Sequence, residues 1–209
     1  LFTTPHLCHV EERIRLDGKL ITPEEFDGFI QQIMDVANQE PQVEPTFYEA
    51  TFLVAMLAFS VARIDWAVIE TGLGGRLDAT RLVLAKACVL TSLSLEHTDI
   101  LGDSLQKIAI EKVAIVPPSV PVVSIWNEDE SVKRIIESSP SEQSLGWWCH
   151  PLTMQRWRFD QQFQSDEVSQ QVTFHEEARL LAECVLNDAL GLQIDTERIS
   201  GKKLLWPAR

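Results

Sequence analysis

The chain has 209 residues, of which 45% are hydrophobic and 23% are charged, and it contains 4 cysteines. This composition is typical of a globular protein and excludes collagen-like, disordered and disulfide-dense chains. Asp and Glu number 31 against 18 Lys and Arg, so the net charge of −13 argues against nucleic-acid or anionic-membrane binding.

Two helices are predicted in the first third of the chain. Thr22, Pro23 and Glu25 have the spacing of a helix start with a capping box, which predicts a helix over residues 23–37. Thr46 and Glu49 repeat the spacing and open an apolar segment, residues 50–62, that is too long for a strand. We therefore predict a second, buried helix.

Short apolar strands and helices alternate in the rest of the chain. Strands separated by helices predict a three-layer α/β/α fold with a mostly parallel, doubly wound sheet. Residues 139–172 are less regular, and we interpret them as short antiparallel strands or a flap. The predicted strands are 64–69, 87–93 and 120–126, and the predicted helices are 103–116, 128–138 and 173–190.

The cysteines and the apolar segments indicate in which cellular compartment the protein is expected. Cys8, Cys88, Cys149 and Cys184 have no metal-binding spacing, which favours free thiols in a reducing cytoplasm. The longest apolar run, residues 52–59, is shorter than the ~20 residues of a spanning helix. We therefore predict a cytoplasmic protein.

Three residues could form a metal site. Glu70 ends a predicted buried strand before the glycine-rich loop 71–75, and His97 follows the next strand, so both are expected at the ligand-binding edge of the sheet. The alternatives are a solvated Glu and a capping or surface His. Lys112 falls within the apolar stripe of its helix, so its ammonium is expected to point inward unless it reaches the rim.

A buried lysine with a lowered pKa can react with carbon dioxide to form a carbamate, which acts as a carboxylate. Such a group beside Glu70 and His97 would offer oxygen and nitrogen ligands for Mg²⁺.

Several motifs occur in order along the chain: Thr3-Thr4-Pro5-His6-Leu7, Glu12-Arg13-Ile14, Pro45 to Glu49, the block Glu70 to Thr80, His97-Thr98-Asp99 with Leu101-Gly102, Glu111-Lys112, and Trp206 to Arg209. In this order they closely resemble those of the folylpolyglutamate synthase and dihydrofolate synthase family, part of the Mur ligase superfamily. The block of residues 70–80 is highly specific.

The resemblance implies an ATP-dependent ligase of folate biosynthesis. In this family, ATP phosphorylates a carboxyl group of dihydropteroate or of a folate's glutamate. The amine of L-glutamate then displaces phosphate from the acyl phosphate to form an amide. The implied partners are these small molecules with ATP and Mg²⁺, and we expect a monomer that binds neither nucleic acid nor membrane.

The resemblance also implies roles for individual residues. Thr4, Glu70 and His97 match metal ligands, and Lys112 matches a lysine that becomes carbamylated; Lys112 and His97 are the expected catalytic residues. Arg209 matches an arginine that contacts ATP phosphate. The residues that match pterin-binding segments are Thr46, Phe47, Tyr48, Glu49, Leu77, Asp78 and Ala79.

The chain departs from the family pattern at several positions. The ATP-contacting Asn expected near the start of the last helix is absent, and Glu177 or Arg179 lies in its neighbourhood. The other departures are Thr4 for Ser, Arg81 for Asn, Glu96 for Asp and Ala208 for Gly.

The predicted domain organisation is incomplete at both ends. Residues 1–205 are expected to form one central ATPase-type domain without its N-terminal phosphate-binding loop, and residues 206–209 to begin a linker to an absent C-terminal domain. We expect the 209 residues alone to lack ligase activity. The alternatives are a cell-wall Mur-type amino-acid ligase, disfavoured by the motifs at Thr4 to Leu7 and Arg76 to Thr80, and a truncated, non-catalytic product.

Overall fold

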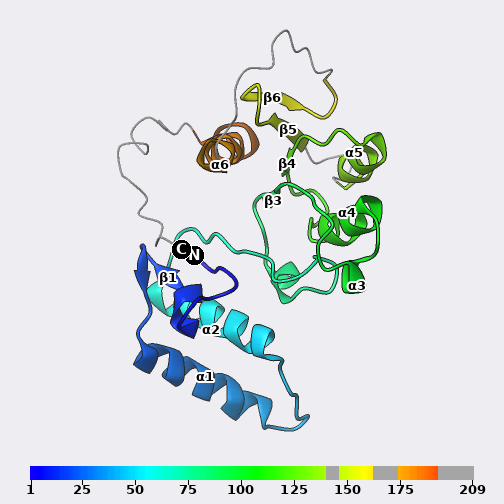
Figure 1. The fold of residues 1–209 in the computed structure, drawn as a ribbon. Helices are drawn as coiled ribbons and strands as arrows, with labels where there is room; N and C mark the ends of the chain where they lie inside the picture. The colour runs from blue at the N-terminus through cyan, green and yellow to red at the C-terminus, as the bar shows by residue number, and fades with distance from the viewer. Residues whose placement is uncertain (140–145, 162–173, 193–209) are drawn as a thin grey trace. The chain divides into compact units, whose positions relative to one another are not determined.

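The computed structural model describes residues 1–139, 146–161 and 174–192 (Figure 1). The chain divides into two compact units, Leu1–Val83 and Leu84–Arg209, and each is described by itself. The single domain over residues 1–205 stays a prediction. The expected linker at residues 206–209 lies outside the described residues.

The first unit is built on two helices that begin at the predicted caps. The helix α1 (Pro23–Ala37) follows Thr22, whose side chain accepts from the Glu25 N–H. The helix α2 (Phe47–Ala62) follows Thr46, which forms the same capping box with Glu49. Both predicted helices are confirmed, because the cap satisfies backbone N–H groups that the first turn leaves unpaired.

The chain before α1 forms small elements that close the unit. They are the 3-10 helix η1 (Val10–Arg13) and a hairpin of β1 (Arg15–Leu16) and β2 (Lys19–Leu20). Asp17 and Gly18 have φ of 48° and 81° in the two-residue turn, the left-handed pair that a tight hairpin requires.

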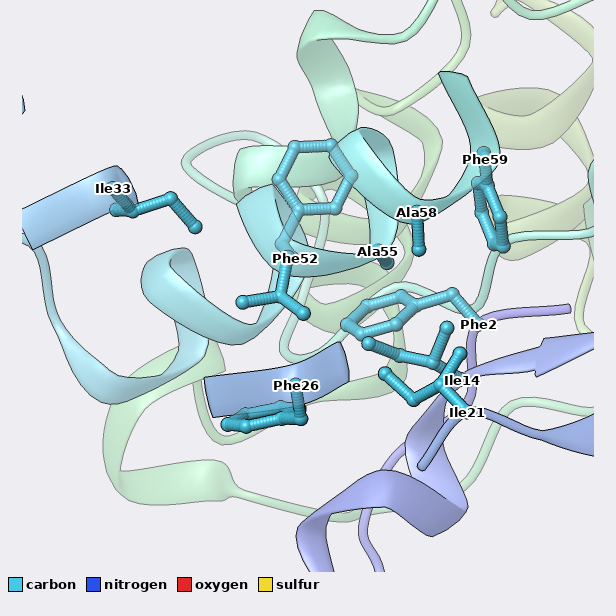
Figure 2. Close-up of a cluster of buried hydrophobic side chains, with 10 residues drawn as sticks. Phe2, Ile14, Ile21, Phe26, Ile33, Phe52, Ala55, Ala58 and Phe59 are labelled. Atoms are coloured by element: carbon cyan, nitrogen blue, oxygen red, sulfur yellow. The ribbon is translucent and has the colours of Figure 1, made fainter. Parts of the chain in front are cut away.

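An apolar core joins the two helices to the N-terminal segment (Figure 2). Phe2 and Ile14 are fully buried, and the Phe2 ring lies 5.9 Å from that of Phe52, edge to face. Phe26 and Ile33 of α1 belong to the same buried cluster. This core holds the residues around Thr4 against the first turns of α2.

The predicted buried strand at residues 64–69 is wrong within this unit. Only Ile69 forms a bridge, parallel to Phe2, while Trp66 and Val68 are 59% and 70% exposed. A strand is buried only when neighbouring segments cover its edges and faces. Among the described residues of this unit, Phe2 alone pairs with the segment 64–69. The loop that follows contains the 3-10 helix η2 (Ala79–Leu82).

The second unit contains a four-stranded sheet in the order β3 (Cys88–Leu90), β4 (Val122–Ile125), β5 (Gly146–His150) and β6 (Gln155–Arg158). The first three strands are parallel, and β6 is antiparallel to β5. The mostly parallel sheet is therefore confirmed. The predicted antiparallel strands after residue 139 are confirmed only for the β5–β6 pair, because β5 extends the parallel sheet.

Helices cover both faces of this sheet. Val122 and Trp148 face a core with α4 (Leu105–Val113) and α5 (Glu130–Glu137), and Val123 and Cys149 face a core with α6 (Phe174–Glu183). Successive strand residues point to opposite faces, so both layers are needed to bury β4. This is the predicted three-layer α/β/α arrangement.

Two shorter segments complete the second unit. They are α3 (Thr98–Leu101), which precedes α4, and η3 (Cys184–Ala189), a π-helical turn that extends α6. Among the helices that the structure describes, none is both long and apolar enough to cross a membrane.

Candidate functional site

The first unit contains a cavity of about 710 Å³ between the start of α2 and the loop that leads into η2. Its size is within the range of small-molecule sites. The cavity brings together residues from the two segments that match pterin-binding segments in the resemblance. The residues that line it are Val43, Glu44, Pro45, Glu49, Phe52, Leu53, Arg76, Leu77, Asp78, Ala79, Arg81 and Leu82.

The cap of α2 fixes one wall of the cavity. The Glu49 carboxylate accepts hydrogen bonds from the Thr46 N–H and hydroxyl, both at 2.8 Å. These bonds hold the pKa of Glu49 below its ordinary value, because they stabilise the charged form. Glu49 is therefore an anion at neutral pH, in a fixed position.

Asp78 organises the opposite wall. Its Oδ2 accepts from the N–H groups of Gly72 and Leu73 at 2.9 and 3.0 Å. Its Oδ1 accepts from the Thr80 N–H at 2.9 Å, the Thr80 hydroxyl at 2.6 Å and the Tyr48 hydroxyl at 3.2 Å. Asp78 is only 9% exposed, and these donors compensate for the burial of its carboxylate. The residue is thus occupied in holding the loop together.

Tyr48 links this loop to α2. Burial raises the pKa of Tyr48, and the charge of Asp78 and its hydrogen bond raise it further. The phenol is therefore neutral and can donate to Asp78. A Cβ at Gly72 would lie 2.6 Å from the Tyr48 ring, so glycine permits the close approach of the loop to the ring.

Two predicted metal ligands lie together in the first unit. The Thr4 N–H donates to Oε2 of Glu70 at 2.8 Å, so the carboxylate is held beside the backbone that carries the Thr4 hydroxyl. Glu12 fixes the adjoining loop, because its carboxylate accepts from the N–H groups of residues 7, 8 and 9 at 2.8 to 3.1 Å.

Arg13 connects the same loop to α2. Its Nε donates to Nδ1 of His6 at 2.9 Å, and its guanidinium lies over the Phe47 ring, 5.2 Å from the centroid. Arg13 is 8% exposed, whereas Phe47 is 61% exposed. The sequence motif that contains Arg13 indicated no role for it, and the structure shows that it links two segments of the site.

The other predicted metal residues lie in the second unit. His97 is exposed, has a φ of 51° and precedes α3 as its N-cap. Non-glycine residues rarely adopt this left-handed backbone, and such strained positions are concentrated at functional sites. The His97 imidazole makes no capping hydrogen bond.

Lys112 is half-buried, so its predicted position inside the core is only partly correct. Ile108 and Ala109 of the same stripe are fully buried. Lys112 lies in the last turn of α4, where the helix carbonyls favour a positive charge.

Glu70 and Thr4 thus belong to one unit, and His97 and Lys112 to the other. Their assembly into one metal site stays a prediction. Within the described part of the chain, no three His, Cys, Asp or Glu side chains gather to form a metal site. The predicted metal ligands include a threonine hydroxyl and a carbamylated lysine, which are not among those four residue types.

The structure brings only part of the predicted pterin set to the cavity. Glu49, Leu77, Asp78 and Ala79 line it, whereas Thr46, Phe47 and Tyr48 do not. Arg76 and Arg81 also line the cavity, and the resemblance implied no role for either, although both lie beside the matched run Leu77 to Ala79. Arg209 lies outside the described residues.

No family model matches the chain. Folylpolyglutamate synthase of Arabidopsis thaliana is 40% identical over 150 residues, which cover 69% of this chain and 26% of that protein. The solved complex of E. coli FolC with DHPP and ADP has a TM-score of 0.63 at 29% identity and covers 70% of this chain and 36% of that one.

A further solved structure is a bifunctional folylpolyglutamate synthase/dihydrofolate synthase with Mn, AMPPNP and L-glutamate bound. It has a TM-score of 0.61 at 28% identity, over 70% of this chain and 36% of that one. The chain therefore spans between 26% and 36% of the length of these three proteins. The shared motifs, the fold and these similarities show that, over about 70% of its length, the chain belongs to the folylpolyglutamate synthase and dihydrofolate synthase family.

Proposed function

We propose that the chain is part of an ATP-dependent ligase that joins L-glutamate to dihydropteroate or to a folate, and that its first unit carries the pterin-binding cavity. The observation that supports this most directly is the cavity itself. Glu49 and the run Leu77 to Ala79 are far apart in the sequence, yet they line one space. Both segments match pterin-binding segments in the family.

The chemistry of the cavity suits a flat heteroaromatic ligand. Glu49 provides an ionised acceptor for ring N–H groups, and the exposed side chains of Leu53 and Leu77 provide apolar surface. The Asp78 carboxylate is already bound by the loop. Its role is therefore to hold Leu77 and Ala79 in position rather than to provide a free acceptor.

The donor types of the predicted metal residues fit Mg²⁺. Thr4 and Glu70 offer a hydroxyl and a carboxylate, His97 offers an imidazole, and carbamylation would convert the Lys112 amine into an oxygen donor. Mg²⁺ with ATP would supply the phosphoryl group that activates the substrate carboxyl. The hydrogen bond from the Thr4 N–H holds the Glu70 carboxylate in place.

The complete reaction requires more than these residues. The chain spans 26% of the Arabidopsis relative, so we propose that the 209 residues bind the pterin but do not form the amide by themselves. We also propose that the protein acts as a monomer in the cytoplasm on small molecules. Its net charge of −13 argues against nucleic acid as a partner.

Thermal unfolding with two candidate ligands tests the proposed function. Dihydropteroate should raise the Tm of the chain by several degrees, since a ligand at about 100 times its Kd adds about 2.7 kcal/mol. A UDP-sugar peptide should have no effect. Stabilisation by the UDP-sugar peptide alone would favour a cell-wall ligase, and stabilisation by neither would refute a substrate-binding role.

A pair of substitutions locates the binding. Leu77 is 82% exposed and lines the cavity, whereas Val61 is 71% exposed and does not. Leu77→Asp should abolish the rise in Tm, and Val61→Asp should leave it intact. Equal effects of the two substitutions would place the ligand elsewhere.

A further inference from the structure

The basic side chains of the cavity come from one short segment. Arg76 and Arg81 line it on either side of Asp78. Arg81 lies in η2, and its Nη1 donates to the carbonyl oxygen of Arg76 at 3.1 Å. Within the described residues, the Arg81 guanidinium donates no other hydrogen bond. A guanidinium has five N–H donors, so most of those of Arg81 remain available to a ligand.

The position of Arg81 is fixed before any ligand binds. Asp78 caps η2 and ties it to Tyr48 and to residues 72 and 73 through its hydrogen bonds. A guanidinium on a rigid segment loses less conformational entropy on binding than one on a mobile loop. The loop therefore presents Arg81 at the edge of the cavity at low entropic cost.

Charge and apolar surface are distributed unevenly around the cavity. Apart from Asp78, the acidic side chains of the cavity are Glu44, which precedes α2, and Glu49, which lies in its first turn. Both arginines come from residues 76–81. Leu77 and Leu82, each 82% exposed, lie next to the arginines in sequence. This arrangement suits a ligand with N–H groups at one end, an apolar middle and an anionic tail.

We propose that Arg81 is a specificity-determining residue that binds a carboxylate of a glutamate tail, so that the cavity favours glutamylated pteroates over pteroate itself. The inference rests on the proposed function. A net charge of −13 repels polyanionic ligands at long range, so their binding requires a local cation. A guanidinium binds a carboxylate through two parallel hydrogen bonds, which gives it an advantage over lysine.

Binding to the 209-residue chain tests this inference. The probes are pteroate, pteroylglutamate and pteroyltriglutamate, with Kd measured by calorimetry at low and high salt. The unaltered chain should bind the triglutamate most tightly. Arg81→Asn, which introduces the residue usual in the family, should weaken triglutamate binding roughly threefold to fivefold and leave pteroate binding unchanged. The Kd of Arg81→Lys for the triglutamate should lie between those of the unaltered chain and Arg81→Asn.

Arg63 provides the matched control, because it is exposed, lies in the same unit and does not line the cavity. Arg63→Asn removes the same charge at a left-handed position that Asn tolerates, and it should leave all three Kd values unchanged. High salt should reduce the triglutamate preference of the unaltered chain.

The outcomes separate the inference from the proposed function. If the ligands bind but Arg81→Asn weakens all three equally, or has no more effect than Arg63→Asn, the inference is wrong and the proposed function stands. If none of the three binds, both are wrong.

Discussion

The two units are stabilised in different ways. In the second unit, strands β4 and β5 are buried throughout and lie between two layers of helices. In the first unit, the loop at residues 70–82 is organised mainly by hydrogen bonds to one carboxylate, Asp78, and a predicted strand is left exposed. Buried apolar layers tolerate little change, whereas a hydrogen-bonded loop can present side chains to a cavity. The comparison indicates that the sheet of the second unit depends on apolar packing, whereas the cavity loop of the first unit depends on the hydrogen bonds of one carboxylate.

The largest effect is expected in the sheet of the second unit. Trp148 is 1% exposed, packs edge to face on Trp126 at 5.4 Å and donates to Glu137 at 3.1 Å. Trp148→Ala should lower the free energy of unfolding by about 3–5 kcal/mol, because it leaves a large cavity in the core. Urea unfolding followed by circular dichroism measures the change.

Trp66 is the matched control in the first unit, since it is 59% exposed. Trp66→Ala should change the free energy of unfolding by less than about 1 kcal/mol. A large loss at Trp66 would mean that residues 64–69 are buried in the intact protein, and it would remove the contrast between the two units.

An intermediate effect is expected at the polar centre of the first unit. In the unaltered chain the N–H groups of Gly72 and Thr80 donate to the Asp78 carboxylate. Asp78→Asn places an amide NH₂ group, itself a donor, against one of these N–H groups. The free energy of unfolding should fall by about 2–3 kcal/mol, because at least one buried donor loses its partner. The same substitution at the exposed Asp65 should have little effect. Equal changes at the two positions would show that Asp78 does not organise the loop.

The smallest effect at neutral pH concerns Tyr48, which is the single tyrosine of the chain. Its pKa is raised in the folded state, so the neutral phenol contributes stability that is fully present below about pH 10, the ordinary tyrosine value. That contribution is lost as the pH rises through the folded-state pKa. Near-ultraviolet absorbance should show phenolate forming at higher pH in the folded chain than in the denatured chain.

Asp78 provides an internal check on this titration. Asp78→Asn removes the neighbouring charge and should move the phenolate midpoint towards its ordinary value. If phenolate forms at the same pH in the folded and denatured chains, Tyr48 is exposed and does not bind Asp78.

The sequence alone determined most local structure. Thr22 and Thr46 fixed the starts of α1 and α2, because a cap satisfies N–H groups within its own turn and needs no distant partner. The alternation of apolar strands and helices determined the parallel, three-layer fold of the second unit. The motif at residues 77–79 also identified three residues that line the cavity.

Tertiary structure decided which of these side chains are free to act. The motif gave no sign that Asp78 is occupied by donors from Tyr48, Gly72 and Thr80, since those partners are set by how the loop folds. Nor did helical periodicity predict that Lys112 is only half-buried, because the burial of a side chain depends on the segments that pack against its helix. Spacing along a chain specifies neighbours within one helix or strand, but burial and hydrogen-bond partners depend on which segments meet in space.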